Sequence, residues 1–330
     1  MGQQADHARK VVLRMSLPDG AMDRLGRAFP EGRFITCAGD QDLDRHLADV
    51  EVLIGGQQLS PELARQAPRL RWVQSLSVGM EGFLDLAAQC RGIQVASARG
   101  ANTTPLAEHA LMMMLSFARG MPELSRRQAS GQWLPPLSPG TAPSVFELSG
   151  SRLGLIGYGR IGRAIAQRAK AFDMDVWALR RSATGEDGGP ADRVLGPQGL
   201  PDLLAAADHV LVIAPLTPET RGMISSEAFA RMKPSAYFYN MSRGAIVDTA
   251  ALVEALRGRM IAGAGLEVVD PEPLATDSPL WSMENVIITG HTAGLTPRLL
   301  DRNIDFLVGQ FDRYQRGTRL LNLVDGGIGY

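Results

Sequence analysis

The sequence predicts an α/β protein with two doubly wound parallel-sheet domains. Apolar strand segments alternate with helical segments from residue 10 to residue 97, and a second alternation runs from residue 152 to residue 289. Parallel strands joined by right-handed helical crossovers carry helices on both faces of the sheet. The chain has 330 residues, which is enough for two domains, each with its own core.

The first alternation predicts a domain of five strands. The expected strands are 11–15, 33–37, 51–54, 71–76 and 93–97. The expected helices are 21–29, 42–49, a short helix capped by Ser60 with Pro61 in its first turn, and 81–90. A longer helix over 105–119, with Thr104 as its cap, leads into the second domain. We expect its His109 to serve packing, and a catalytic role is the alternative. Residues 133–143 are rich in proline and predict an extended arm or an oligomer contact.

A loop of the first domain is a candidate anion site. Val78 and Gly79 follow the strand 71–76 at its carboxyl end, where open α/β sheets bind ligands. Glycine lets neighbouring backbone N–H groups point outward together, so the pair could hold a small carboxylate. An ordinary strand-to-helix turn is the alternative.

The second domain begins with a glycine-rich turn. An apolar strand, 152–156, runs into Gly157, Gly159 and Gly162, and a helix is expected over 160–172. This spacing suits a tight turn, a close approach of backbone to phosphate, and close packing of helix on strand. The turn therefore predicts a dinucleotide site at the start of the helix.

The end of the next strand, 176–179, indicates which dinucleotide is preferred. An NAD site usually has an acidic residue there for the ribose hydroxyls, whereas this chain has Arg180, Arg181 and Ser182. Guanidinium groups bind phosphate through paired hydrogen bonds, which favours the 2′-phosphate of NADP. Two solvated arginines beside a bound NAD are the alternative.

Four further strands are expected over 208–214, 236–240, 263–269 and 286–289. The last three are followed by Arg243, Glu272 and His291, and parallel strands end on the same side of their sheet. Arg243 could hold a substrate carboxylate, and His291 could donate a proton near neutral pH. Glu272 could accept from the other ring nitrogen and favour the imidazolium. Together they suit hydride transfer to a 2-keto acid.

Composition excludes several classes of function. The formal net charge is −1 with acidic and basic residues interspersed, so nucleic acid and anionic membrane are not expected partners. Cys37 and Cys90 are far apart, which argues against a disulfide framework and a structural zinc site, and no metal is expected. Residues 1–10 are polar and read as neither a secretory signal nor a membrane anchor, so we expect a cytoplasmic enzyme.

These motifs resemble the D-isomer-specific 2-hydroxyacid dehydrogenase family. The resemblance runs from Ser77-Val78-Gly79 through the glycine turn, Pro215-Leu-Thr-Pro-Glu-Thr220, Asn240-Met-Ser-Arg243-Gly244 and Asp270-Pro-Glu272-Pro273 to His291-Thr-Ala-Gly294. It implies catalysis by Arg243, Glu272 and His291, a substrate seat at Val78, Gly79 and Arg243, and a homodimer. It also implies a flavodoxin-like substrate domain of residues 1–101 plus 297–330, with a helix returning over 297–316, and a Rossmann dinucleotide domain of residues 102–296 across a cleft. The expected cofactor contacts are Gly157, Gly159, Arg160, Ile161, Arg180, Arg181, Ser182, Pro215, Thr220, Met241, Glu267 and His291.

The chain departs from the family pattern at three positions, and one of them is Arg180, which replaces the acidic ribose ligand as in NADP-using relatives. Relatives usually have Asp near the nicotinamide carboxamide where this chain has Glu267, and Pro before the catalytic histidine where it has Gly290. The expected function is NADP-preferring reduction of a small 2-keto acid, such as glyoxylate, hydroxypyruvate or a larger homologue, with NAD as a possible cofactor. The alternatives are a dinucleotide-sensing protein similar to corepressors, and phosphite or another oxidation on the same scaffold. Formate oxidation is disfavoured by Glu272, and a phosphoglycerate dehydrogenase with an effector domain is disfavoured by chain length.

Overall fold

A computed structural model of the protein describes residues 9–37, 40–133, 145–182 and 189–326. The chain divides into two compact units, Met1–Asn102 with Thr296–Tyr330, and Thr103–Leu295. The expected boundaries, after residues 101 and 296, each lie one residue from these divisions. Each unit contains one parallel sheet with helices on both faces, which confirms the predicted fold class.

The first unit has a five-stranded sheet in the order β2-β1-β3-β4-β5. Its strands are β1 (Arg9–Leu13), β2 (Gly32–Thr36), β3 (Val50–Ile54), β4 (Trp72–Gln74) and β5 (Gln94–Ala96). Its helices are α1 (Asp19–Ala28), α2 (Asp40–Asp44), α3 (Pro61–Arg65), α4 (Leu84–Gln89) and α11 (Leu299–Gln315), with a 3-10 turn at Glu81–Phe83 before α4. The Ser60 hydroxyl accepts from the Leu63 amide at 3.2 Å, so the predicted cap of α3 is confirmed.

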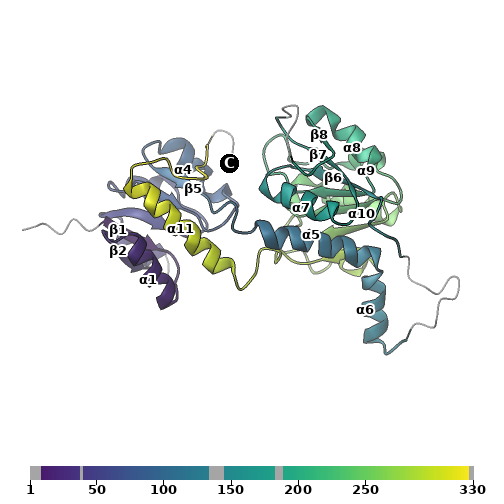
Figure 1. Cartoon of the computed structure of the whole chain (residues 1–330), viewed down its shortest axis with the longest axis horizontal. Helices are drawn as coiled ribbons and strands as arrows, with labels where there is room; N and C mark the ends of the chain where they lie inside the picture. Colours follow the sequence, from purple (N-terminus) through teal and green to yellow (C-terminus); the bar gives the residue numbers. More distant parts are fainter. Residues whose placement is uncertain (1–8, 38–39, 134–144, 183–188, 327–330) are drawn as a thin grey trace, which may run out of the picture. The chain divides into compact units, whose positions relative to one another are not determined.

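Alternate side chains of β1 enter the two cores of this sheet. Val11 and Leu13 pack on the face covered by α1 and α11, while Val12 belongs to the core on the other face. Figure 1 shows α11, the last helix of the chain, beside α1 near its beginning. Phe29, which follows α1, stacks on Phe311 of α11 with ring centroids 4.8 Å apart. The predicted return of the C-terminal helix to the first unit is therefore confirmed.

The second unit has a seven-stranded sheet in the order β12-β11-β10-β9-β6-β7-β8. Its strands are β6 (Arg152–Ile156), β7 (Asp175–Leu179), β8 (Arg193–Leu195), β9 (His209–Val212), β10 (Tyr237–Asn240), β11 (Gly263–Leu266) and β12 (Val286–Ile288). The chain runs outward from β6 through β7 and β8, then crosses back to β9 on the other side of β6. Open α/β sheets bind ligands at the carboxyl ends of the strands where the order reverses in this way, here at β6 and β9.

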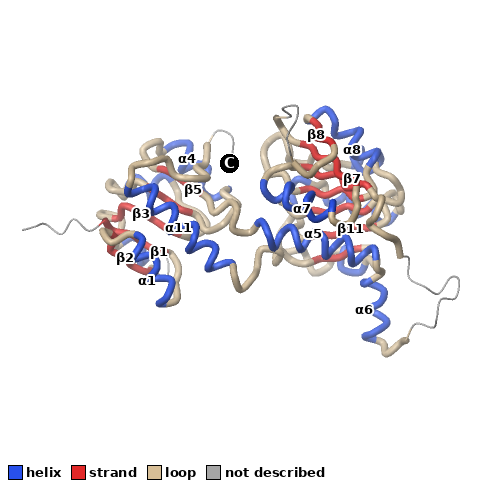
Figure 2. The backbone as a smooth tube through the Cα atoms, in the orientation of Figure 1, coloured by secondary structure: helices blue, strands red, loops and turns tan. Residues whose placement is uncertain are grey.

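Helices cover both faces of the second sheet (Figure 2). One core includes side chains of α5 (Thr103–Ala118) and α7 (Arg160–Lys170), and the other includes side chains of α8 (Leu200–Ala206), α9 (Ser226–Arg231) and α10 (Thr249–Arg257). Met113 and Met114 of α5 are buried, whereas Met112 is 40% exposed. A helix turns by about 100° per residue, so three consecutive side chains cannot all face one core.

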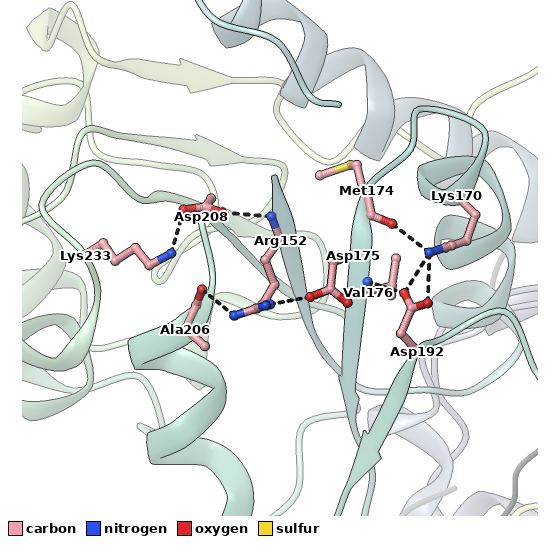
Figure 3. Close-up of polar contacts among 9 residues, drawn as sticks. All are labelled: Arg152, Lys170, Met174, Asp175, Val176, Asp192, Ala206, Asp208 and Lys233. Carbon is pink, nitrogen blue, oxygen red and sulfur yellow. Dashed lines mark hydrogen bonds and ion pairs between the residues drawn. The ribbon is translucent and has the colours of Figure 1, made fainter. Parts of the chain in front are cut away.

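Charged groups join the strand starts of this sheet, opposite the strand ends that carry the candidate site (Figure 3). Asp208 accepts from the Arg152 amide and from Lys233, each at 2.8 Å, and the Arg152 guanidinium donates to Asp175 at 2.6 Å. The Asp192 carboxylate accepts from the Lys170 ammonium group and from the Val176 amide of β7. Burial raises the pKa of Asp208, but the hydrogen bonds from Lys233 and the Arg152 amide outweigh it, so its pKa is lowered overall.

Some sequence predictions differ from the observed elements. The prediction of Thr104 as a helix cap is wrong, because α5 begins at Thr103 and Thr104 lies inside its first turn. The three-residue strand β8 and the exposed helix α6 (Met121–Ala129) were not predicted. The proline-rich segment 133–143 lies outside the described residues except for Trp133. Within the ranges that are described, no helix combines the length and apolar character needed to cross a membrane.

Candidate functional site

Close backbone packing builds the glycine turn between β6 and α7. Gly157 has a φ of +112°, and a Cβ atom there would lie 2.6 Å from the Ala214 backbone nitrogen. A Cβ atom on Gly162 would lie 2.4 Å from the Gly157 carbonyl oxygen. The first and third glycines of the motif are therefore required by the turn itself.

Gly159 differs because no atom lies within 4 Å of the place where its Cβ would stand. It is the N-cap residue of α7, and no side chain among the described residues caps the helix there. The amides of Arg160 and Ile161 thus begin an 11-residue helix at an open surface, where the helix dipole favours an anion. This geometry fits the pyrophosphate of a dinucleotide.

The candidate ribose-phosphate residues follow β7, next to the glycine turn. The Gly157 amide donates to the carbonyl oxygen of Leu179, the last residue of β7, at 2.9 Å. Arg180 comes next and is half-buried, while Arg181 and Ser182 are exposed. A hydrogen bond from Thr217 lowers the pKa of Glu219, and the positive charge of Arg181 lowers it further. Arg181 therefore lies close enough to the turn after β9 to interact electrostatically with it.

The turn after β9 is fixed by its own hydrogen bonds. The Thr220 hydroxyl donates to the Pro215 carbonyl oxygen at 2.7 Å and accepts from the Thr217 amide at 2.8 Å. Pro215 is exposed beside this closed turn. Met241, another expected cofactor contact, has a buried side chain in the core shared with α5 and α7, and its amide donates to the Val212 carbonyl oxygen at 3.0 Å, so neither group is open to a ligand.

Strand register aligns the ends of β10, β11 and β12. Asn240 pairs with Leu266, and Leu266 pairs with Ile288. Arg243 lies three residues beyond Asn240, and His291 lies three residues beyond Ile288. The residues that follow these strands therefore leave the sheet at one edge, as predicted.

A buried side chain that the sequence analysis missed shapes the Arg243 turn. Asn240 is 1% exposed, and its amide group donates to the Arg243 carbonyl oxygen at 3.0 Å and accepts from the Ser242 amide at 3.2 Å. A Cβ atom on Gly244 would overlap the Val269 carbonyl oxygen, at 1.8 Å. The Arg243 turn thus packs directly on the segment that leads to Glu272. The sequence does contain a signal for this role, because the otherwise apolar strand Tyr237–Asn240 ends in a polar residue.

Glu272 and His291 form a direct pair. The Nδ1 atom of His291 lies 2.9 Å from Oε2 of Glu272, and the two side chains are 53% and 39% exposed. The other Glu272 oxygen accepts from the Val269 amide at 3.1 Å, which fixes the carboxylate. Contact through Nδ1 leaves the Nε2 atom of the ring to face a ligand.

Glu267, Thr289 and His109 form a polar set of hydrogen-bonded side chains that contacts the loop carrying His291. Glu267, the first residue after β11, is 4% exposed, and its carboxylate accepts from the Ala293 amide at 2.6 Å and from the Thr289 hydroxyl. The Nε2 atom of His109, a residue of α5, is 3.0 Å from the Thr289 hydroxyl oxygen. Burial lowers the pKa of His109, and the charge of Glu267 opposes this lowering. His109 packs in the unit as expected, but it also belongs to this polar set.

Val78 and Gly79 lie in the first unit, between β4 and the Glu81–Phe83 turn. The Ser77 hydroxyl donates to the Gly79 carbonyl oxygen at 2.8 Å, and the Ala98 amide donates to the Ser77 carbonyl oxygen at 3.1 Å. In the described part of the chain, the Val78 and Gly79 amides donate to no backbone acceptor.

Among the described residues, no group of three or more His, Cys, Asp or Glu side chains is arranged to hold a metal ion. The site residues of the second unit instead combine a helix N-terminus, arginines and a histidine–glutamate pair.

Comparison with known proteins agrees with this geometry. Residues 111–293 match the family model described as "D-isomer specific 2-hydroxyacid dehydrogenase, NAD binding domain". The glyoxylate reductase of Pyrococcus furiosus is 33% identical over 322 residues, which cover 93% of this chain and 93% of that protein.

Solved structures are similar over nearly the whole chain. A D-isomer specific 2-hydroxyacid dehydrogenase family protein from Aeromonas salmonicida is 28% identical with a TM-score of 0.82, covering 97% of this chain and 99% of that one. The NADPH-dependent glyoxylate/hydroxypyruvate reductase of Sinorhizobium meliloti, solved with NADP and sulfate, is 25% identical with a TM-score of 0.81, covering 98% and 100% of the two chains.

Proposed function

This chain belongs to the D-isomer-specific 2-hydroxyacid dehydrogenase family, as its motifs predict, and from that premise we propose that it reduces a small 2-keto acid to the D-2-hydroxy acid. As a member of the family it is an NAD(P)-dependent oxidoreductase. Glyoxylate and hydroxypyruvate are the proposed substrates, since similar proteins carry these names. The observation that carries the proposal is the contact of 2.9 Å between His291 and Glu272, at the sheet edge that also carries Arg243.

Each residue of the site has a chemical task in this proposal. A bound nicotinamide supplies the hydride. Arg243 binds the substrate carboxylate and polarises the carbonyl group with its planar set of N–H donors. His291 donates the proton on Nε2 to the carbonyl oxygen as the alcohol forms. Glu272 holds Nδ1, which orients the ring and stabilises the imidazolium.

The proposal extends to the preferred cofactor, NADPH. The amides of Arg160 and Ile161 beside Gly159 suit the pyrophosphate, and Arg180 with Arg181 suits a 2′-phosphate. Ser182, Pro215, Thr220, Met241 and Glu267 complete the proposed cofactor contacts. The absence of an acidic residue directly after β7 supports this choice over NADH.

Three further features belong to the proposal. The amides of Val78 and Gly79 give the substrate carboxylate a second group of donors. We also propose a homodimer, and a cytoplasmic location in keeping with the free thiols of Cys37 and Cys90. Light scattering of the purified protein tests the homodimer.

The decisive experiment follows nicotinamide absorbance with NADPH and NADH against a panel of 2-keto acids. We expect turnover of glyoxylate or hydroxypyruvate, faster with NADPH. Replacement His291→Ala removes the proton donor and should lower kcat by about 100- to 10,000-fold. Its affinity for NADPH, measured by fluorescence, should stay within a factor of about three, because the pyrophosphate and ribose contacts remain.

His46→Ala, in the first unit, is the control and should keep the wild-type rate. Wild-type activity in His291→Ala would contradict the assignment of the acid. A wild-type protein that binds NADPH but turns over no 2-keto acid would instead favour the dinucleotide-sensing alternative.

A further inference from the structure

Glu267 contacts one short loop at three places. Its main-chain carbonyl oxygen accepts from the His291 amide at 2.7 Å, and its Oε1 atom accepts from the Ala293 amide at 2.6 Å. Its Oε2 atom accepts from the hydroxyl of Thr289, the residue after β12. A single residue therefore holds the chain before, at and after His291.

The backbone conformation of this loop requires such support. Gly290 and His291 have φ values of +62° and +61°, so two consecutive residues adopt left-handed conformations. For a residue with a side chain, such as His291, this conformation is unfavourable. No atom lies within 4 Å of a Cβ built on Gly290, and the His291 side chain is 53% exposed, so packing restrains the loop little.

The departures from the family pattern at Glu267 and Gly290 both fit this conformation. Proline is incompatible with residue 290, because its ring fixes φ near −65°. An aspartate at 267 would be one methylene shorter, and its carboxylate could not reach the Thr289 hydroxyl and the Ala293 amide from the same backbone position. The glycine permits the left-handed course of the loop, and the longer acid spans it.

His109 and Thr289 hold the Glu267 carboxylate in turn. The Thr289 hydroxyl donates to Glu267, so its oxygen is free to accept from Nε2–H of His109 at 3.0 Å. His109 Nε2 is also 3.5 Å from the Glu267 Oε2 atom. The groups that hold the carboxylate come from α5 and from the segment after β12, so two elements other than its own strand β11 hold it.

We infer that Glu267 is a positioning residue that fixes the catalytic histidine loop, and that Thr289 and His109 hold its carboxylate for this task. Both of its oxygens are engaged by protein groups, so its main role is to hold His291 in place and a nicotinamide contact is secondary. The inference rests on the proposed role of His291 as the acid.

The test compares Glu267→Asp with Glu267→Gln. The shorter aspartate side chain cannot make both hydrogen bonds to the loop, so the His291 ring is displaced. We expect kcat to fall by about 10- to 100-fold, since a displacement of about 1 Å at a catalytic group has effects of this size. The NADPH dissociation constant should stay within about threefold because the pyrophosphate contacts are untouched. The glutamine keeps the length and an acceptor for the Ala293 amide, and should restore kcat to within about fivefold of wild type.

A second measurement reports on the loop without turnover. Nitrogen-15 labelling of histidine gives NMR signals for the imidazoles, and His291→Ala identifies the signal of His291. In the cofactor-free protein, Glu267→Asp and Thr289→Val should shift or broaden the His291 signal, whereas Glu267→Gln should leave it near its wild-type position. Glu284→Asp, which shortens an exposed acid before β12, is the matched control and should change neither kcat nor the spectrum.

The results that would contradict the positioning role of Glu267 differ from those that would contradict the proposed function. Wild-type kcat in Glu267→Asp, or an unchanged His291 signal in Thr289→Val, overturns the positioning role. Weaker NADPH binding with unchanged kcat at saturation, in both Glu267 variants, would make Glu267 a cofactor contact instead. Full activity of His291→Ala would refute the proposed function, whatever the Glu267 variants do. If Glu267→Asp does not fold, Glu267→Gln and Thr289→Val decide the matter through the same two measurements.

Discussion

Arg180 is the side chain on which the proposed cofactor preference depends most. It follows the last residue of β7, and its amide donates to the Leu195 carbonyl oxygen of β8 at 3.0 Å, so its backbone is anchored between two strands. We predict that Arg180→Asp lowers kcat/KM for NADPH by about 10- to 100-fold, because a hydrogen bond to a charged group contributes about 1.5–3 kcal/mol. The same variant should use NADH as well as, or better than, the wild type.

Parallel assays with both cofactors measure this change. Arg231→Asp replaces an exposed arginine of α9 and provides a control for the loss of positive charge. An Arg180→Asp variant that discriminates between the cofactors as the wild type does would leave the NADP assignment without its main support.

Individual residues differed in how far the sequence could assign them. The glycines, Glu272 and His291 could be proposed as site residues because their chemistry depends on residue type and spacing along the chain. Asn240 and Thr289 were missed because their roles arise from contacts that only the folded chain creates. His109, on α5, lies 180 positions before Thr289 in the sequence. No local pattern predicts a contact over such a separation.

The turn between β6 and α7 allows its glycines to be tested against each other. Gly162→Ala would force a Cβ atom to within 2.4 Å of the Gly157 carbonyl oxygen, so this turn must open. We predict a loss of stability of about 1–3 kcal/mol, typical of overpacking, together with weaker NADPH binding. Gly159→Ala meets no atom within 4 Å and should keep the wild-type unfolding temperature, yet it should still weaken NADPH binding.

Thermal unfolding and NADPH fluorescence, measured on both variants, separate the two effects. Wild-type affinity for NADPH in Gly159→Ala would show that the pyrophosphate does not bind at this turn.

Element prediction succeeded where the pattern was long or repeated. The strand Arg152–Ile156 and the helix after it were predicted because an apolar run meets a glycine motif. Strand β8 has only two apolar residues, Val194 and Leu195, and it stands between segments that contain glycine and proline, so no apolar run marks it in the sequence. The start of α5 was placed two residues late because Pro105 is favoured in a first helical turn, whereas the helix already begins at Thr103.

The charged network at the strand starts makes the stability of the second unit depend on acid. Lys170 and the Val176 amide outweigh burial and lower the pKa of Asp192, and Asp208 behaves similarly. A carboxylate with a lowered pKa stabilises the fold above its unfolded-state pKa of about 3.9. That stability is lost as the pH falls through the lower pKa of the folded state.

We therefore predict that Asp208→Asn lowers the free energy of unfolding at pH 7 by about 1 kcal/mol, allowing for the screening of a partly exposed pair. The difference from wild type should shrink below about pH 4 and vanish at lower pH. Denaturant unfolding at several pH values measures it, with the exposed Asp277→Asn as a control. A difference that stays constant with pH would mean that the Asp208 charge does not contribute.

The return of α11 to the beginning of the chain has a consequence during synthesis. Trp72 of the first sheet packs on Phe311 with ring centroids 5.1 Å apart, and Ile54 belongs to the same core. Residues 103–295 form one uninterrupted compact unit, and all of them are synthesised before Phe311. The second unit can therefore reach its native fold while the first sheet, although synthesised earlier, still has one face uncovered, until residues 299–315 have been made.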